Sequence, residues 1–178
     1  MTIEYVDRAW NPMTGCRNTL AECPTADTCW ARTLSHRFVQ ICGGDFQPRY
    51  HLSRLENPLE WHKPCRIATC FMGDLFGDWR EVEAIGSLGA TLDYKGWDMA
   101  EVQRQILVIV RKCPQHSFLF LTKNPSTLAQ WNPWPENAWA GASAWDEASA
   151  IKAIYYLQKV QAKVKWLSLE PLLDRIMK

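Results

Sequence analysis

The 178-residue chain lacks both a long hydrophobic run and a recognisable leader. No apolar stretch approaches the roughly 20 residues that a membrane-spanning helix needs. The first ten residues, MTIEYVDRAW, have neither a basic start nor an apolar core, so they are not typical of a signal peptide. We therefore expect a cytoplasmic protein.

An excess of one charge is also absent, because the formal net charge is only +1. This balance gives no electrostatic signal for nucleic-acid binding. The sequence contains no Ser-His-Asp or metalloprotease pattern, and Gly43-Gly44 is too short to be a phosphate-binding loop. It has no internal repeat, low-complexity stretch or linker, so residues 1–178 are predicted to form a single domain.

Cysteine, in contrast, is abundant. Seven cysteines in a reducing compartment favour metal binding or buried thiols over disulfides. Three of them, Cys16, Cys23 and Cys29, lie in a cysteine loop at residues 10–31. A helix is expected over residues 27–40, capped by Asp27 or Thr28 and ended by Cys42 and the two glycines after it. Folding the loop against that helix N-terminus would bring the thiols together and stabilise them as thiolates.

Three thiolates leave a coordination position open, which suits an iron–sulfur cluster whose fourth iron binds another molecule. They also suit a zinc ion with a fourth ligand from elsewhere, for which Cys42 and Cys65 are candidates. Three thiols without a metal are the remaining alternative.

After residue 64, short apolar runs alternate with amphipathic segments. Strands are expected at 66–72, 117–122, 137–143 and 164–169, with helices at 98–112, 126–131 and after Asp146. The first helix is expected to begin with a capping box of Asp98 and Glu101. Residues 2–9 are predicted as a short strand or arm, 45–50 as a loop, 51–61 as a short helix and 79–97 as an irregular insertion. The alternation predicts an α/β fold with parallel βα units over residues 64–178.

Each predicted strand is followed by a polar side chain. These side chains belong to Asp74, Lys123, Ser143 and Glu170. Chemistry in parallel sheets is placed at the carboxyl ends of the strands, so we expect these groups to face one site. Three of them also have a structural alternative: a turn or cap residue for Asp74 and Glu170, and a solvated strand end for Lys123.

The cysteine loop and the strand ends together resemble a family of phage-encoded and bacterial proteins, a domain of unknown function with a radical-SAM-like three-cysteine loop. The matching pieces are Trp10-Asn11-Pro12, Thr14-Gly15-Cys16, Cys23, Cys29-Trp30-Ala31, Pro58-Leu59, Gly73-Asp74-Leu75-Phe76, Phe120-Leu121-Thr122-Lys123 and Ser168 with Glu170-Pro171-Leu172-Leu173. Two features depart from the family pattern. The gap between Cys23 and Cys29 is wider than in relatives, and relatives continue with further strands after this last segment.

The resemblance implies a partial, incomplete TIM barrel that holds a [4Fe–4S] cluster and S-adenosylmethionine. It implies that Cys16, Cys23 and Cys29 hold the cluster. If such a cofactor binds, the residue types at the strand ends suit its groups: Asp74 and Glu170 the amino group and sulfonium, Ser143 the ribose, and Lys123 the carboxylate. Trp10 or Trp30 would stack on the adenine. An incomplete barrel has an unpaired edge at residues 164–169, so we expect a homodimer or a partner chain to cover it.

A rival hypothesis treats the cysteine loop as a structural staple. In that case zinc or a cluster stabilises a non-catalytic binding module. The ten tryptophans and the basic side chains would then face a protein or nucleic-acid partner during phage growth.

Overall fold

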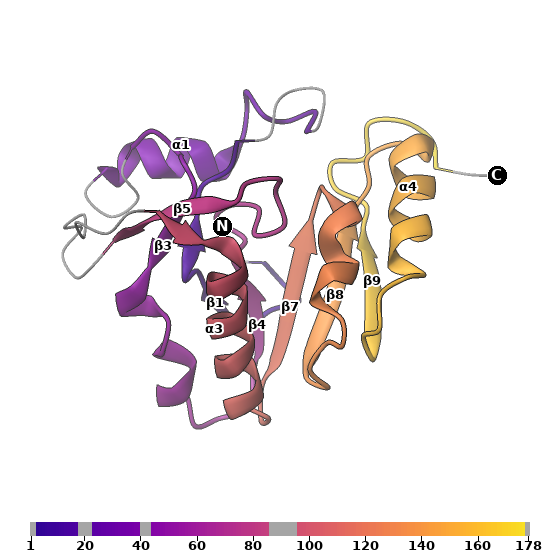
Figure 1. The fold of residues 1–178 in the computed structure, drawn as a ribbon. Helices are drawn as coiled ribbons and strands as arrows, with labels where there is room; N and C mark the ends of the chain where they lie inside the picture. The colour runs from indigo at the N-terminus through magenta and orange to yellow at the C-terminus, as the bar shows by residue number, and fades with distance from the viewer. Residues whose placement is uncertain (1–2, 18–22, 40–43, 86–95, 177–178) are drawn as a thin grey trace.

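The computed structural model describes residues 3–17, 23–39, 44–85 and 96–176. Its main sheet has five strands, all parallel, in the order β1-β4-β7-β8-β9 (Figure 1). These strands are β1 (Arg8–Trp10), β4 (Arg66–Thr69), β7 (Ser117–Thr122), β8 (Ala138–Ser143) and β9 (Val164–Ser168). The predicted α/β class and parallel sheet are confirmed. Among the described residues β1 and β9 do not pair with each other, so the sheet does not close into a barrel.

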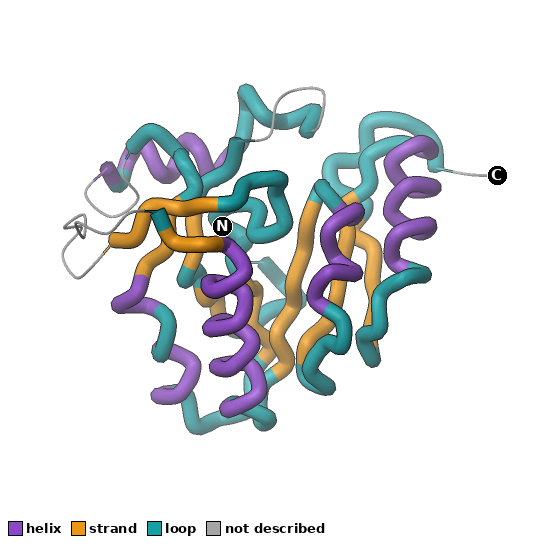
Figure 2. The backbone as a smooth tube through the Cα atoms, in the orientation of Figure 1, coloured by secondary structure: helices purple, strands orange, loops and turns teal. Residues whose placement is uncertain are grey.

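Three helical segments cover one face of this sheet (Figure 2). They are α3 (Met99–Lys112), the 3-10 helix η4 (Pro125–Trp131) and α4 (Glu147–Leu157). Asp98 caps α3 by accepting a hydrogen bond from Ala100 N, but the predicted capping box is wrong because Glu101 instead binds Arg104 and Gln105. No helix in the described ranges is long and apolar enough to cross a membrane.

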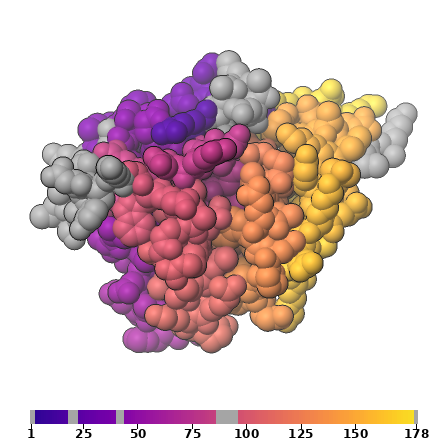
Figure 3. All heavy atoms as spheres, in the orientation of Figure 1, coloured from indigo at the N-terminus to yellow at the C-terminus, as the bar shows by residue number. Residues whose placement is uncertain are grey.

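The main hydrophobic core lies between the sheet and these helices. Its aromatic centre is formed by Phe76, Phe120, Trp131 and Trp134, whose ring centroids are 4.7 to 6.2 Å apart. Such pairs add about 0.5–1.5 kcal/mol each beyond the area that they bury. Figure 3 shows α3 and η4 side by side on the outside of this core.

A second, four-stranded sheet has the order β2-β3-β5-β6. It contains β2 (Met13–Thr14), β3 (Arg49–His51), β5 (Glu81–Ile85) and β6 (Trp97–Asp98). The predicted loop at 45–50 and the irregular region at 79–97 are therefore wrong where β3, β5 and β6 form, and residues 86–95 lie outside the described part. The short helix predicted at 51–61 is two 3-10 turns, η1 (Leu52–Arg54) and η2 (Asn57–Glu60).

The helix after the cysteine loop, α1 (Trp30–Arg37), is shorter than the predicted 27–40. Its N-cap is Cys29, without a side-chain hydrogen bond, so the predicted caps Asp27 and Thr28 are wrong. The predicted helix end at Cys42 and Gly43 lies outside the described residues.

Candidate functional site

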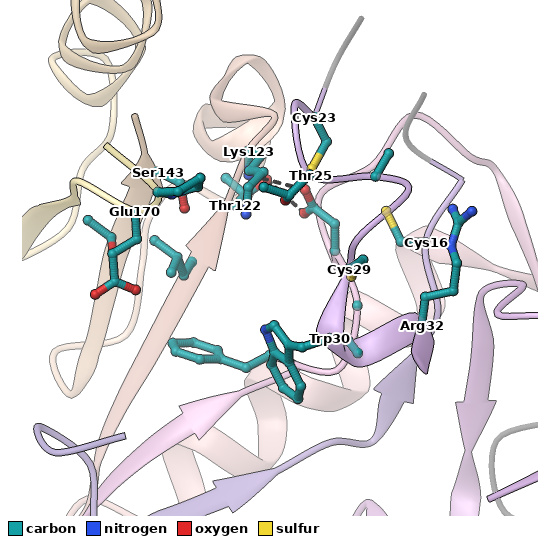
Figure 4. A pocket seen from close by; sticks show the side chains of 18 of the residues that line it. Cys16, Cys23, Thr25, Cys29, Trp30, Arg32, Thr122, Lys123, Ser143 and Glu170 are labelled. Carbon is teal, nitrogen blue, oxygen red and sulfur yellow. Dashed lines mark hydrogen bonds between the residues drawn. The ribbon is translucent and has the colours of Figure 1, made fainter. Parts of the chain in front are cut away.

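A cavity of about 770 Å³ lies at the carboxyl ends of the parallel strands. The three cysteines of the loop and all four predicted strand-end residues line it. They are Cys16, Cys23, Cys29, Asp74, Lys123, Ser143 and Glu170 (Figure 4). Segments far apart in the sequence therefore meet here, as expected for a site at the carboxyl edge of a parallel sheet.

Cys16 is positioned by a backbone bridge between Gly15 and Gly73. Gly15 N donates to Met72 O at 3.0 Å, and Asp74 N donates to Gly15 O at 3.3 Å. Gly15 has a φ of +88°, which favours glycine, and a Cβ on Gly73 would lie 2.3 Å from Gly15 O. This close approach attaches the start of the cysteine loop to the loop that follows β4.

The same loop is held from its other side by a buried histidine. His51 Nε2 lies 2.7 Å from the hydroxyl of Thr14, two residues before Cys16, and His51 N donates to Pro12 O at 2.7 Å. Burial, with smaller contributions from Arg54 and Arg49, lowers the pKa of His51 to about 3. The imidazole is thus neutral at physiological pH and serves as an anchor for the loop.

Cys23 and Cys29 complete the cysteine side of the cavity. Cys23 is buried, with its Sγ 3.4 Å from the hydroxyl of Thr25. Cys29 is the N-cap of α1, whose first turn contains no acidic residue. Its thiol therefore lies at the positive end of a helix with no nearby carboxylate on that turn.

Asp74 joins the ends of two strands. Its carboxylate accepts hydrogen bonds from Thr122 Oγ1 (2.7 Å), Phe76 N (3.0 Å) and Lys123 N (3.2 Å). Burial raises the pKa of Asp74, and these hydrogen bonds oppose that rise. The carboxylate fixes the geometry between β4 and β7 while it faces the cavity.

A polar group of side chains lies at the ends of β8 and β9. Ser143 and Ser168 are register partners, so they lie side by side on one face of the sheet. Both are buried and line the cavity next to Glu170 and Tyr5. Burial and the Glu170 charge raise the pKa of Tyr5, which a hydrogen bond with Ser168 partly offsets.

Sequence reasoning did not single out Tyr5, Arg32, Thr122 or Ser168, although all of them line the cavity. Thr122 is the last residue of the predicted strand 117–122 and Ser168 the last but one of the predicted strand 164–169, so a search of strand-end positions would have included them. Tyr5 and Arg32 carry no comparable signal, because the folding of the N-terminal segment and of α1 over the sheet brings them there.

The two tryptophans proposed to stack on adenine have different environments. Trp30 lines the cavity and is 46% exposed. Trp10 is 1% exposed, packs against Phe118 at 5.5 Å and donates from Nε1 to Arg54 O. It belongs to the hydrophobic core, which leaves Trp30 as the aromatic candidate.

The three cysteines line one cavity but do not form a compact metal site in the described part of the chain. Within the described ranges, no three His, Cys, Asp or Glu side chains gather closely enough to hold one metal ion. A tetrahedral zinc site needs its ligands within about 2.3 Å of one point, whereas a [4Fe–4S] cluster binds each thiolate through a different iron.

Of the two cysteines predicted as alternative fourth zinc ligands, Cys65 does not line the cavity. Cys65 precedes β4, at the amino end of the sheet, where its Sγ lies 3.3 Å from His116 Nδ1. Cys42 lies outside the described residues. No fourth thiol ligand for the cavity is therefore seen in the described part of the chain.

A sequence model for the family described as "Protein of unknown function (DUF5131)" matches residues 1–178, so the chain belongs to this family. Searches of the curated proteins and of the solved structures found no match. The match over residues 1–178 agrees with the family motifs quoted from the sequence, which follow one another along most of the chain. Membership by itself assigns neither a cofactor nor a reaction.

Proposed function

We propose that this DUF5131 protein is an iron–sulfur enzyme of the radical-SAM type. The main support is that three cysteines from one loop share a cavity with polar groups from four strand ends. The cavity volume of about 770 Å³ is within the usual range for small-molecule sites. A cofactor held by the thiols and a ligand held by the strand ends would therefore be neighbours.

The order of the strands supports an incomplete βα barrel. From β1 through β4, β7 and β8 to β9, each strand of the sheet lies next to the one that precedes it in the chain. A barrel grows in this sequential way, whereas a doubly wound sheet reverses direction at a switch point. In a barrel, the site lies at the carboxyl ends of the strands, which is where the cavity is found.

Cys16, Cys23 and Cys29 are the proposed cluster ligands. When bound and reduced, a [4Fe–4S] cluster of this kind supplies the electron that cleaves S-adenosylmethionine and starts hydrogen abstraction from a substrate. The surrounding chain limits access of water, since Cys23, Asp74 and Ser143 are all buried.

The strand-end residues are the proposed S-adenosylmethionine ligands. Glu170 is exposed to the cavity and suits the amino group and the sulfonium, while the carboxylate of Asp74 already accepts three hydrogen bonds. Paired hydroxyls such as those of Ser143 and Ser168 suit a ribose. Lys123 suits a carboxylate and Trp30 an adenine ring.

The proposal is tested by anaerobic reconstitution with iron, sulfide and reductant, followed by addition of S-adenosylmethionine. The wild type should release 5′-deoxyadenosine, measured by chromatography. Cys16→Ala, Cys23→Ala and Cys29→Ala should release none, whereas Cys113→Ala, a core cysteine, should retain release.

A fully reconstituted cluster that yields no 5′-deoxyadenosine would overturn the radical-SAM proposal. Colourless protein with one zinc per chain would support the rival hypothesis of a zinc-stabilised binding module. Either result would leave the family fold unchanged.

A further inference from the structure

The Nε atom of Arg32 is buried without a hydrogen-bond acceptor in the described part of the chain. The residue lies on α1, three positions after Cys29, and lines the cavity. Its Nε is buried and has no hydrogen-bond partner among the described residues. None of the ion pairs in the described ranges includes Arg32. Its recorded neighbour is the ring of Phe46, 5.6 Å from the guanidinium carbon.

The Arg32 side chain is partly buried, and its Nε has no acceptor among the described residues. A guanidinium stays charged in proteins, and a buried donor without an acceptor costs about 1–3 kcal/mol, more when it is charged. By contrast Arg49, whose side chain is 11% exposed, pairs with both Asp45 and Glu83. Among the residues that the structure describes no carboxylate pairs with Arg32, so we expect the acceptor to come from a ligand.

The surroundings of Arg32 favour an anion. The first turn of α1 contains no acidic residue that would neutralise the positive end of the helix. Three acidic side chains line the cavity: Glu4, Asp74 and Glu170. Asp74 is held by Thr122 and Lys123 at the end of β7, and Figure 4 shows Glu170 on the opposite side of the cavity from Arg32. The side of the cavity at Arg32 and Cys29 therefore carries a positive charge and the positive end of a helix.

We propose that Arg32 forms a carboxylate-binding subsite on the cysteine side of the cavity. The proposal rests on the proposed function, because the occupant is a small molecule bound beside the three thiols. The planar guanidinium presents parallel N–H groups that match the two oxygens of a carboxylate. The carboxylate belongs either to S-adenosylmethionine, in which case Arg32 rather than Lys123 takes it, or to a separate carboxylic-acid substrate.

The first experiment measures binding by calorimetry under anaerobic conditions, with reconstituted wild type, Arg32→Gln, Arg32→Lys and Arg37→Gln. Arg37→Gln removes the same charge from the exposed end of α1 and is the matched control. If the carboxylate is that of S-adenosylmethionine, Arg32→Gln should weaken its binding about 10- to 100-fold, the usual effect of losing a charge-assisted hydrogen bond. Decarboxylated S-adenosylmethionine should bind all four proteins with similar affinity, and Arg32→Lys should recover part of the loss.

The second experiment tests whether the carboxylate comes from a separate carboxylic acid, and it does not need S-adenosylmethionine. Thermal unfolding of the purified chain is measured with acetate and with succinate at constant ionic strength. Wild type and Arg37→Gln should show saturable stabilisation, and Arg32→Gln should show none. That result would support the subsite even if S-adenosylmethionine does not bind. The subsite can therefore be tested separately from the proposed function. Unchanged affinity and unchanged stabilisation in Arg32→Gln would overturn the subsite, as would a change confined to the reduction potential of the cluster.

Discussion

Gly15 and Gly73 form a parallel backbone bridge in which Gly15 O lies 3.3 Å from the amide nitrogen of Asp74. This bridge connects two loops that each carry a candidate site residue directly afterwards, Cys16 and Asp74. Because both positions lack a side chain, the two backbones approach closely enough for the thiol and the carboxylate to line one cavity. The glycines therefore determine the geometry of the site although they carry no chemistry.

Gly73→Ala should destabilise the protein by about 2 to 4 kcal/mol, since the new Cβ would meet backbone atoms of Gly15 and break the bridge. Chemical denaturation measures this change. Gly96→Ala is the control, because its Cβ would meet the side chain of Glu81 at 3.1 Å, which can move. Equal stability of Gly73→Ala and wild type would show that the bridge does not hold the loop.

Thr122→Val should lower stability by about 1–3 kcal/mol, because the buried Asp74 carboxylate loses the hydroxyl that donates to it at 2.7 Å. Without that donor the pKa of Asp74, already raised by burial, rises further. A raised folded-state pKa lowers stability as pH increases through it, so the deficit should be larger at neutral pH than at about pH 3. Urea unfolding across this pH range measures the deficit, and Thr122→Ser, which keeps the hydroxyl, is the control. Equal stabilities of Thr122→Val and Thr122→Ser at every pH would contradict the account.

His51 should make the protein less stable in mild acid. Its pKa is about 3 in the folded chain and 6.5 ordinarily, so the unfolded state takes up a proton first as pH falls. Stability is therefore full above about pH 6.5 and should decrease by roughly 2 kcal/mol by pH 5. The difference in unfolding free energy between wild type and His51→Gln should follow this curve, while His62→Gln, at an exposed position, should keep the wild-type slope. A flat difference would rule out His51 as a neutral buried anchor.

The β9 edge should mediate association. β9 pairs with β8 alone among the described strands, and Leu172 and Leu173 beside it are each 59% exposed. Sedimentation equilibrium should show concentration-dependent dimers that Leu172→Lys weakens. Ile151→Lys, which alters a comparably exposed apolar residue on α4, is the control. A monomer at every concentration would leave a partner chain as the remaining candidate to cover the edge.

The sequence predicted the parts of the fold that have a local signature. SFLFLT is a compact apolar run bounded by polar residues, and β7 occupies those six residues. Asp98 and Asp146 cap α3 and α4 through their side chains, and both helices were predicted to begin near these residues. The sequence also predicted that Asp74 and Ser143 share a site, because the carboxyl ends of parallel strands lie at one edge of the sheet.

The remaining features depend on contacts between distant segments. β2 and β6 have two residues each, too few for any periodic pattern, and they exist because β3 and β5 pair with them. Trp10 was a candidate ligand by residue type, but its register opposite Thr69 turns the indole toward the core. Arg32 lines the cavity because of where α1 packs, and no local sequence pattern predicts that position.

The central claim is that Cys16, Cys23 and Cys29 hold an iron–sulfur cluster, and the iron content of anaerobically reconstituted protein tests it most directly. Wild type should be brown, with about four iron and four sulfide per chain. The triple variant Cys16→Ala/Cys23→Ala/Cys29→Ala should be colourless and iron-free. Cys70→Ala, which removes a buried thiol whose pKa is raised to about 12, should load like wild type. Wild type that binds no iron, or a triple variant that loads fully, would contradict the account.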